Sequence, residues 1–218
     1  MHPTLRDASL FTLAAGAVFG GHPAHAAASD FVDVKDIVPS VLVDTPYASK
    51  ANVFKTRFYT VNRAFLRRGT ALKLAKAQRT LRAHGLRLKV WDAYRPRSVQ
   101  WAMWRVIQDA RYVAPPGPGS RHARGAAVDV TLVNAKGREL EMPSAFDDFS
   151  VRAHANYNGA SRVAKHNRAV LRAAMIGAGF TPLRHEWWHF NDPQGGQYQM
   201  TDITLTELAA RTKAAKRR

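Results

Sequence analysis

The 218-residue chain contains no cysteine. This absence excludes disulfide bonds, thiolate metal sites and a cysteine nucleophile. Any metal site must therefore be built from His, Asp and Glu side chains. A chain of this length can bury a core without disulfide or metal staples, so we expect any metal to be catalytic rather than structural.

Acidic residues are scarce, with 16 Asp and Glu against 33 Lys and Arg and a formal net charge of +17. Such a surplus suits nucleic acid or anionic envelope polymers. The basic residues are spread along the chain, without an RNA-binding signature or zinc-finger spacing. We therefore expect solubility or attraction to envelope polymers, and no nucleic-acid partner. Only the end is densely basic, at Arg211, Lys213, Lys216, Arg217 and Arg218.

Long apolar runs are also lacking. Residues 10–20 form an apolar run of signal-peptide length, too short to span a bilayer comfortably. Ala24-His25-Ala26 follows and fits the small-x-small cleavage pattern. The basic region before the run is weak, because it has only Arg6 and the amino terminus, and Asp7 offsets one of these charges. We predict a signal peptide over residues 1–26 and a periplasmic location. The alternative is a buried N-terminal helix. Without a second apolar run, we expect no membrane span.

The periodicity of the remaining chain predicts short strands and four helices. Leu86, Leu88 and Val90 alternate with basic residues, which is typical of a half-buried strand. Strands and helices do not alternate regularly, which favours a single α+β domain over a doubly wound fold. We expect a central antiparallel sheet, helices packed on it and a metal site at the sheet. The predicted helices cover residues 70–84, 98–110, 161–178 and 205–215, and the predicted strands cover 41–43, 58–61, 86–90, 126–133 and 180–190.

These elements divide the chain into three predicted parts. The leader covers residues 1–26, the main domain covers 27–204, and a basic C-terminal helix or tail covers 205–218. Pro115 to Gly119 is rich in Pro and Gly and forces a loop before the strand at 126–133.

The first chemical motif spans Ser120 to Asp129, where this loop enters the strand. Asp129 lies between two valines, and a carboxylate in an apolar strand is costly unless it is paired or bound to a cation. Imidazole and carboxylate are a credible pair of zinc ligands, so His122 and Asp129 are candidates. The alternative is a structural Asp bonded to the backbone or to an arginine.

The second motif, His185 to His189, matches the His-Glu-x-x-His zinc motif, which requires a helix. Pro182 and the aromatic interior favour a strand instead. In a strand the two histidines lie too far apart to share a metal, so we expect only His189 to be a ligand. The alternative is a true helical motif with Glu207 as the third ligand. Both interpretations retain Glu186.

The third motif is Asp92-Ala93-Tyr94-Arg95-Pro96, just past the end of a predicted strand. Arg95 could clamp a carboxylate there or stabilise a developing oxyanion. The alternative is an ordinary surface ion pair.

Together the three motifs resemble the VanX-type D-alanyl-D-alanine dipeptidases, within the wider peptidase M15 family of zinc D,D-peptidases. That family has the pattern Ser-x-His-x-x-Gly-x-Ala-x-Asp followed by Glu-x-Trp-His. Ser120 to Asp129 and Glu186 to His189 match it, and Asp92 to Pro96 matches the upstream Asp-x-Tyr-Arg-Pro segment. The resemblance extends from about Asp33 to Asp192.

The resemblance implies one zinc ion per chain, held by His122, Asp129 and His189. It also implies that Glu186 is the general base for metal-activated water and that Arg95 stabilises the transition state. The reaction implied is hydrolysis of the dipeptide D-alanyl-D-alanine to D-alanine.

Two further residues are implied to bind the substrate. Ser120 would help to hold its amino end, and Asp147 of the Phe146-Asp147 segment would contact its ammonium group. Two departures bear on the exact substrate. Arg121 stands where a small residue is common, and the predicted export differs from the cytoplasmic location of the best-known members.

Two other functions remain open at this point. A periplasmic D,D- or L,D-carboxypeptidase acting on peptidoglycan stem peptides would suit export and a basic surface. A non-catalytic basic module that binds cell-wall polymer would suit the charge alone. The second function offers no reason for His122, Asp129, Glu186 and His189 to occur together.

Overall fold

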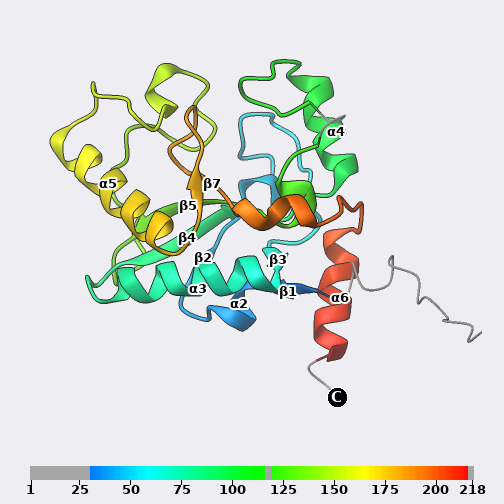
Figure 1. Ribbon diagram of the computed structural model, residues 1–218. Helices are drawn as coiled ribbons and strands as arrows, with labels where there is room; N and C mark the ends of the chain where they lie inside the picture. Colours follow the sequence, from blue (N-terminus) through cyan, green and yellow to red (C-terminus); the bar gives the residue numbers. More distant parts are fainter. Residues whose placement is uncertain (1–29, 116–118, 216–218) are drawn as a thin grey trace, which may run out of the picture.

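A five-stranded sheet forms the centre of the computed structural model, which describes residues 30–115 and 119–215 (Figure 1). The strand order is β2-β4-β5-β7-β6, in which β4, β5, β7 and β6 pair antiparallel and β2 pairs parallel to β4. The predicted α+β fold is therefore confirmed, with one parallel edge strand. The strands are β2 (Leu42–Val43), β4 (Arg87–Asp92), β5 (Ala127–Val133), β6 (Thr181–Pro182) and β7 (His189–Asn191).

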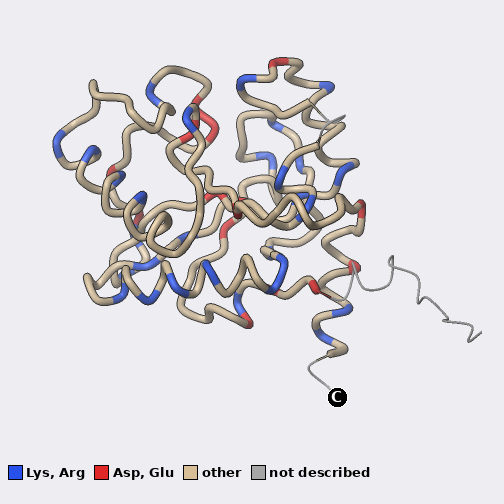
Figure 2. Tube along the Cα trace, in the orientation of Figure 1, with Lys and Arg blue, Asp and Glu red and all other residues tan. Residues whose placement is uncertain are grey.

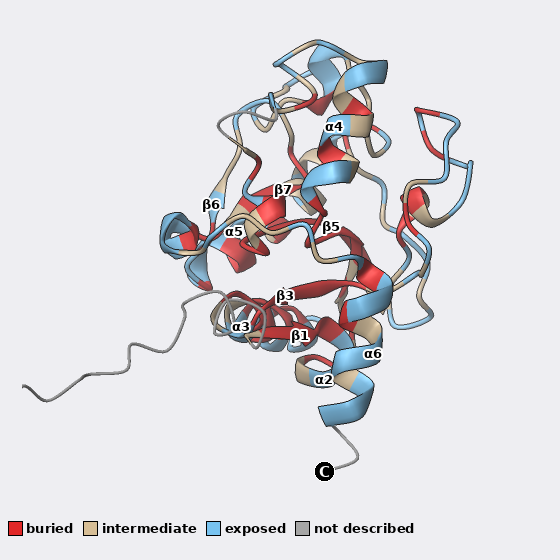
Figure 3. Cartoon of the chain, turned by 90° about the vertical axis from the view of Figure 1, so that its right-hand side faces the viewer, coloured by how far each residue is buried: buried red, intermediate tan, exposed pale blue. Residues whose placement is uncertain are grey.

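Strand β5 lies at the middle of this sheet, and each of its seven residues is buried (Figure 3). A strand covered on both faces has a nearly continuous apolar sequence, as residues 127–133 do apart from Asp129 and Thr131. The burial of Asp129 is thus a direct consequence of its place in the central strand. Neighbouring β4 shows the predicted alternation, with Leu88 and Val90 fully buried.

Helices α3 (Arg68–Arg82) and α5 (Arg162–Gly177) pack against each other, α3 also against β4 and α5 against β5 and β6. The apolar face of α3 meets Leu171 and Met175 of α5 in the main core. The Ser161 hydroxyl accepts the Ala164 N–H and caps α5, which satisfies one of the unpaired donors at a helix start. Helix α3 begins two residues before the start predicted at Thr70, and the Thr70 hydroxyl donates to Asp192 rather than capping the helix.

Helices α4 (Arg97–Val106) and α6 (Leu205–Ala215) lie at the right of Figure 1, away from α5. Met103 of α4 and Leu208 of α6 join a second cluster that is rich in aromatic side chains. Helix α4 is shorter than the predicted 98–110, because the chain leaves helical geometry at Ile107. Helix α6 has the predicted bounds.

The strand predicted at 58–61 is wrong. Tyr59 is buried there in the aromatic cluster, and the N–H groups of Phe58 and Tyr59 both donate to the Tyr47 carbonyl. A strand missed by the prediction, β3 (Phe65–Arg67), pairs instead with β1 (Phe31–Asp33), which runs directly into the short helix α2 (Val34–Ile37). Both corrections concern segments whose partners are distant in sequence.

The continuous strand predicted at 180–190 is also wrong. Strands β6 and β7 form a hairpin, with Thr181 opposite Asn191, and residues 183–188 form the turn between them. The Trp187 indole donates to the Ser144 hydroxyl and packs into the core, which holds the turn in place.

Lysine and arginine are spread over most of the described chain rather than gathered on one element (Figure 2). Within residues 30–115 and 119–215, the helices are all too short or too polar to traverse a bilayer. The predicted leader, residues 1–26, lies outside the described residues.

Candidate active site

Three separate elements bring the predicted metal ligands together. His122 opens a short 3-10 helix, η2 (His122–Arg124), while Asp129 lies in β5 and His189 begins β7. Asp129 and His189 are directly opposite each other in the antiparallel β5–β7 pair. Gly125 turns the chain from η2 into β5 with a positive φ of 69°, a conformation that suits glycine.

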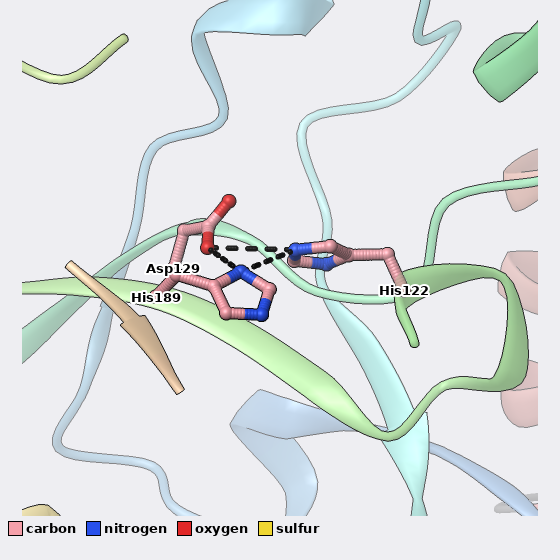
Figure 4. A group of neighbouring side chains, drawn as sticks. All are labelled: His122, Asp129 and His189. Carbon is pink, nitrogen blue, oxygen red and sulfur yellow. Dashed lines mark hydrogen bonds and ion pairs between the residues drawn. The ribbon is translucent and has the colours of Figure 1, made fainter. Parts of the chain in front are cut away.

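The three side chains converge on one point (Figure 4). His122 Nε2 lies 3.1 Å from His189 Nδ1, and Asp129 Oδ1 lies 3.4 Å from the first and 2.9 Å from the second. All three residues are buried. Two nitrogens and one carboxylate oxygen in this arrangement fit a divalent transition metal that keeps a further position open.

The remaining nitrogen of each imidazole is held by an oxygen acceptor. His122 Nδ1 lies 2.6 Å from the Ala93 carbonyl, and His189 Nε2 lies 3.0 Å from Asn191 Oδ1. Because a carbonyl oxygen can only accept, each of these nitrogens carries the proton. The lone pairs of His122 Nε2 and His189 Nδ1 therefore face each other and Asp129, as metal ligation requires.

The electrostatics of the site favour positive charge. Burial alone lowers the pKa of His122, but the carboxylates of Asp129 and Asp92 outweigh it and raise that pKa above its ordinary value. Burial has the opposite effect on Asp129 and raises its pKa, but the neighbouring His122 and His189 hold that pKa well below its usual range. Both shifts mean that an added positive charge is stabilised between these side chains. A bound cation would provide that charge.

Glu186 lies in the β6–β7 turn, with Oε2 3.7 Å from His189 Nδ1. Burial raises the pKa of the Glu186 carboxyl to about 8, with His189 lowering it and Asp129 raising it. A carboxyl group with such a pKa can take up and release a proton near neutral pH.

Arg95 follows β4 and is buried, so the interpretation of this motif as a surface ion pair is wrong. Its Nε and Nη2 donate to Asp92 Oδ2 at 2.9 and 2.6 Å, and its Nη1 donates to Gln100 Oε1 at 2.8 Å. Asp92 also accepts the Tyr59 hydroxyl at 2.6 Å. The guanidinium group is thereby fixed in orientation and remains charged.

Asp147 and Ser120 lie in the same cavity, which has a volume of about 290 Å³. Asp147 has a positive φ of 56°, rare for a residue other than glycine, and its Oδ2 accepts the Tyr47 hydroxyl at 2.8 Å. Burial raises the pKa of Asp147 to about 7. All the predicted site residues line this cavity: Arg95, Ser120, His122, Asp129, Asp147, Glu186 and His189.

The helical interpretation of His185 to His189 is wrong. Glu207, its proposed third ligand, instead accepts bonds from the N–H and hydroxyl of Thr204 at the start of α6. His185 Nδ1 lies 3.4 Å from His154 Nε2, away from the convergent group. The hairpin turn separates the two histidines of the motif, so only His189 joins His122 and Asp129.

Sequence reasoning missed Gln100 and Asn191, whose side chains position Arg95 and His189. Asn191 has a weak signal, because residues two apart in a strand share one face. Gln100 has none, since nothing in its α4 neighbourhood indicates contact with Arg95.

A family model described as D-Ala-D-Ala dipeptidase, peptidase M15, matches residues 27–206. The chain belongs to this family. It is similar to the D-alanyl-D-alanine dipeptidase of Escherichia coli K12, with 35% identity over 172 residues that cover 79% of this chain and 89% of the relative. It is also similar to the D-alanyl-D-alanine dipeptidases of Enterococcus faecalis V583 and Enterococcus faecium. These share 31% and 32% identity over 181 residues, covering 73% of this chain and 90% of each relative.

Membership of the M15 family agrees with the resemblance carried by the three motifs. The match covers the sheet, the main core cluster and every residue of the cavity named above, and it ends within α6, before Leu208 of the second cluster. The convergent group of His122, Asp129 and His189 is therefore a candidate metal centre in a peptidase fold.

Proposed function

We propose that the protein is a zinc-dependent dipeptidase that hydrolyses D-alanyl-D-alanine. The observation that carries this proposal is the convergence of His122, Asp129 and His189 beside Glu186 in one cavity. The curated relatives named D-alanyl-D-alanine dipeptidase support the choice of substrate.

His122, Asp129 and His189 would hold the zinc ion. A zinc ion in such a site supplies a Lewis acid and lowers the pKa of a water molecule bound to it. The donor set favours zinc, because two imidazoles and one carboxylate without thiolate suit a borderline cation.

Glu186 acts as the general base in this proposal. Its carboxylate accepts the proton of the attacking water and later returns it to the leaving amine. The raised pKa of Glu186 suits both steps, because a group that titrates near the working pH can accept and donate with little loss.

Arg95 stabilises the negative charge that develops on the attacked carbonyl oxygen. A guanidinium group has five N–H donors. Asp92 and Gln100 occupy three of them, which leaves one N–H on each terminal nitrogen for the substrate. A fixed donor aimed at a developing oxyanion contributes on the order of 10²–10³ in turnover.

Ser120 and Asp147 bind the amino end of the substrate in this proposal. An ammonium group beside Asp147 would offset the burial that raises its pKa and would favour the carboxylate. The aromatic side chains of Phe54 and Tyr112 both pack against Phe149, and all three line the same cavity. In this proposal they would limit the length of substrate that the cavity accepts. These walls favour a free dipeptide over the end of a longer stem peptide.

The test compares free D-Ala-D-Ala with a peptidoglycan stem pentapeptide, using protein of measured zinc content. We expect cleavage of the dipeptide, loss of activity with a chelator and recovery on adding zinc. A protein that trims the pentapeptide but leaves the dipeptide intact would be a carboxypeptidase and would contradict the proposal.

We also propose that the leader exports the enzyme to the periplasm, with residues 27–204 as the catalytic domain and 205–218 as a basic C-terminal helix or tail. Peptidoglycan fragments would be a natural source of substrate there, and the surplus of basic residues would favour anionic envelope polymers.

A further inference from the structure

A second pair of histidines lies close to the active site and has no part in the proposed reaction. His154 follows the 3-10 helix η3 (Val151–Ala153), and His185 lies in the β6–β7 turn directly before Glu186. His185 Nδ1 is 3.4 Å from His154 Nε2, and the ring centroids are 4.8 Å apart. Neither histidine is among the described residues that line the active-site cavity.

The backbone on both sides of this pair is fixed. The Ala155 N–H donates to the Arg184 carbonyl at 3.0 Å, and the Trp187 N–H donates to the Ala153 carbonyl at 2.8 Å. Trp187 is buried and anchored by its indole. These two bonds flank the histidines and hold the two segments side by side, so bringing the imidazoles together needs no further ordering of the backbone.

The separation of the two nitrogens suits a shared metal ion. Two nitrogens bound tetrahedrally to zinc at 2.0–2.1 Å lie about 3.3–3.4 Å from each other. The corresponding nitrogens of His122 and His189 are 3.1 Å apart. His185 is exposed and His154 half-buried, so water can complete the coordination.

We propose that His154 and His185 form a second, exchangeable metal site for Zn²⁺ or a similar late first-row cation. Imidazole is a preferred ligand of these cations. The site has two protein ligands where the active site has three, so it binds the more weakly of the two and fills only when the cation is in excess. This inference rests on the proposed function only in that His122, Asp129 and His189 bind the first equivalent of zinc.

Equilibrium dialysis of the full chain against rising Zn²⁺ tests the site by counting bound zinc per chain. We expect the wild-type chain to pass from one equivalent to two, and His154→Gln and His185→Gln each to stop at one. His166→Gln, which removes an exposed histidine of α5, is the matched control and should still reach two. A wild-type chain that stops at one equivalent, or variants that still reach two, would overturn the proposal.

A measurement without substitutions provides a second test. Paramagnetic Ni²⁺, added to zinc-loaded wild-type protein, should broaden the imidazole proton signals of His154 and His185 before those of His84 and His166. Equal broadening of the signals of all four histidines would overturn the proposed site. His189→Ala separates this result from the proposed function, because it should lose the tightly bound equivalent while retaining the weaker one.

Discussion

At the scale of single residues, Glu186 and His189 are neighbours in space with different proposed roles. We expect Glu186→Gln to retain zinc and to lose roughly 10²–10⁴ in turnover, the usual contribution of a general base. His189→Ala should lose both zinc and activity, because it removes a ligand. Zinc content by atomic absorption and turnover of D-Ala-D-Ala would be measured on the same samples. Full activity in Glu186→Gln would remove the proposed base.

Gln100 positions Arg95 without facing the substrate. It is 1% exposed, accepts from Arg95 Nη1 and donates its Nε2 to the Ala114 carbonyl at 2.7 Å. Since Ala114 lines the cavity, this amide ties the arginine to the cavity wall. We expect Gln100→Met to lower kcat about tenfold with little change in KM or zinc content, because a donor misplaced in the transition state costs on the order of one to two kcal/mol.

Gln78 provides a matched control for that variant. It is also a buried glutamine that joins a helix to backbone groups, since it accepts from the Leu88 N–H and donates to the Leu86 carbonyl. Gln78→Met should lower the melting temperature and leave kcat unchanged. Equal loss of kcat in both variants would mean that Gln100 acts only through stability.

At the scale of elements, Gly125 joins η2 to β5 and so sets the distance between His122 and Asp129. Its φ is 69°, and a Cβ there would lie 2.3 Å from the Phe31 ring. A left-handed conformation costs a residue other than glycine about 1–2 kcal/mol. Overpacking against the ring adds roughly 1–3 kcal/mol. We expect Gly125→Ala to lower the free energy of unfolding by at least about 2 kcal/mol, measured with urea.

Gly85 separates the two causes of that loss. Its φ is 68°, nearly the same as that of Gly125, but a Cβ there would meet nothing within 4 Å. Gly85→Ala should therefore show the backbone cost alone, about 1–2 kcal/mol. Similar losses in the two variants would mean that contact with Phe31 is unimportant at this junction.

At the scale of the whole molecule, the proposed leader leads to a prediction about residues 1–26, which lie outside the described residues. We expect the mature protein to begin at Ala27 in the periplasmic fraction of a producing bacterium, measured by mass spectrometry of its N-terminus. Ala26→Arg should block cleavage, because the recognition pattern needs a small residue there. An intact N-terminus on a cytoplasmic protein would contradict the export proposal.

The candidate metal site could be predicted largely from local signals. Asp129 in an apolar run had to meet a cation or a donor, and the structure places it beside His122 and His189. The predicted structures also form at residues 70–82, 87–90 and 162–177. Helical and alternating patterns could be recognised there, because each pattern reflects the buried face of a single element. The prediction failed at 58–61, where aromatic residues fill a cluster instead of a strand.

The family, the central strand and the candidate site residues could be predicted from the amino-acid sequence, because spacing and residue chemistry are properties of short segments. The turn at 183–188, the contact of His185 with His154 and the support that Gln100 and Asn191 give to Arg95 and His189 are visible in the fold alone. The physical reason is that the pairing of β6 with β7 and the contacts of Trp187, Arg95 and His189 come from packing. Packing depends on every element that surrounds a residue, and a local pattern does not contain that information.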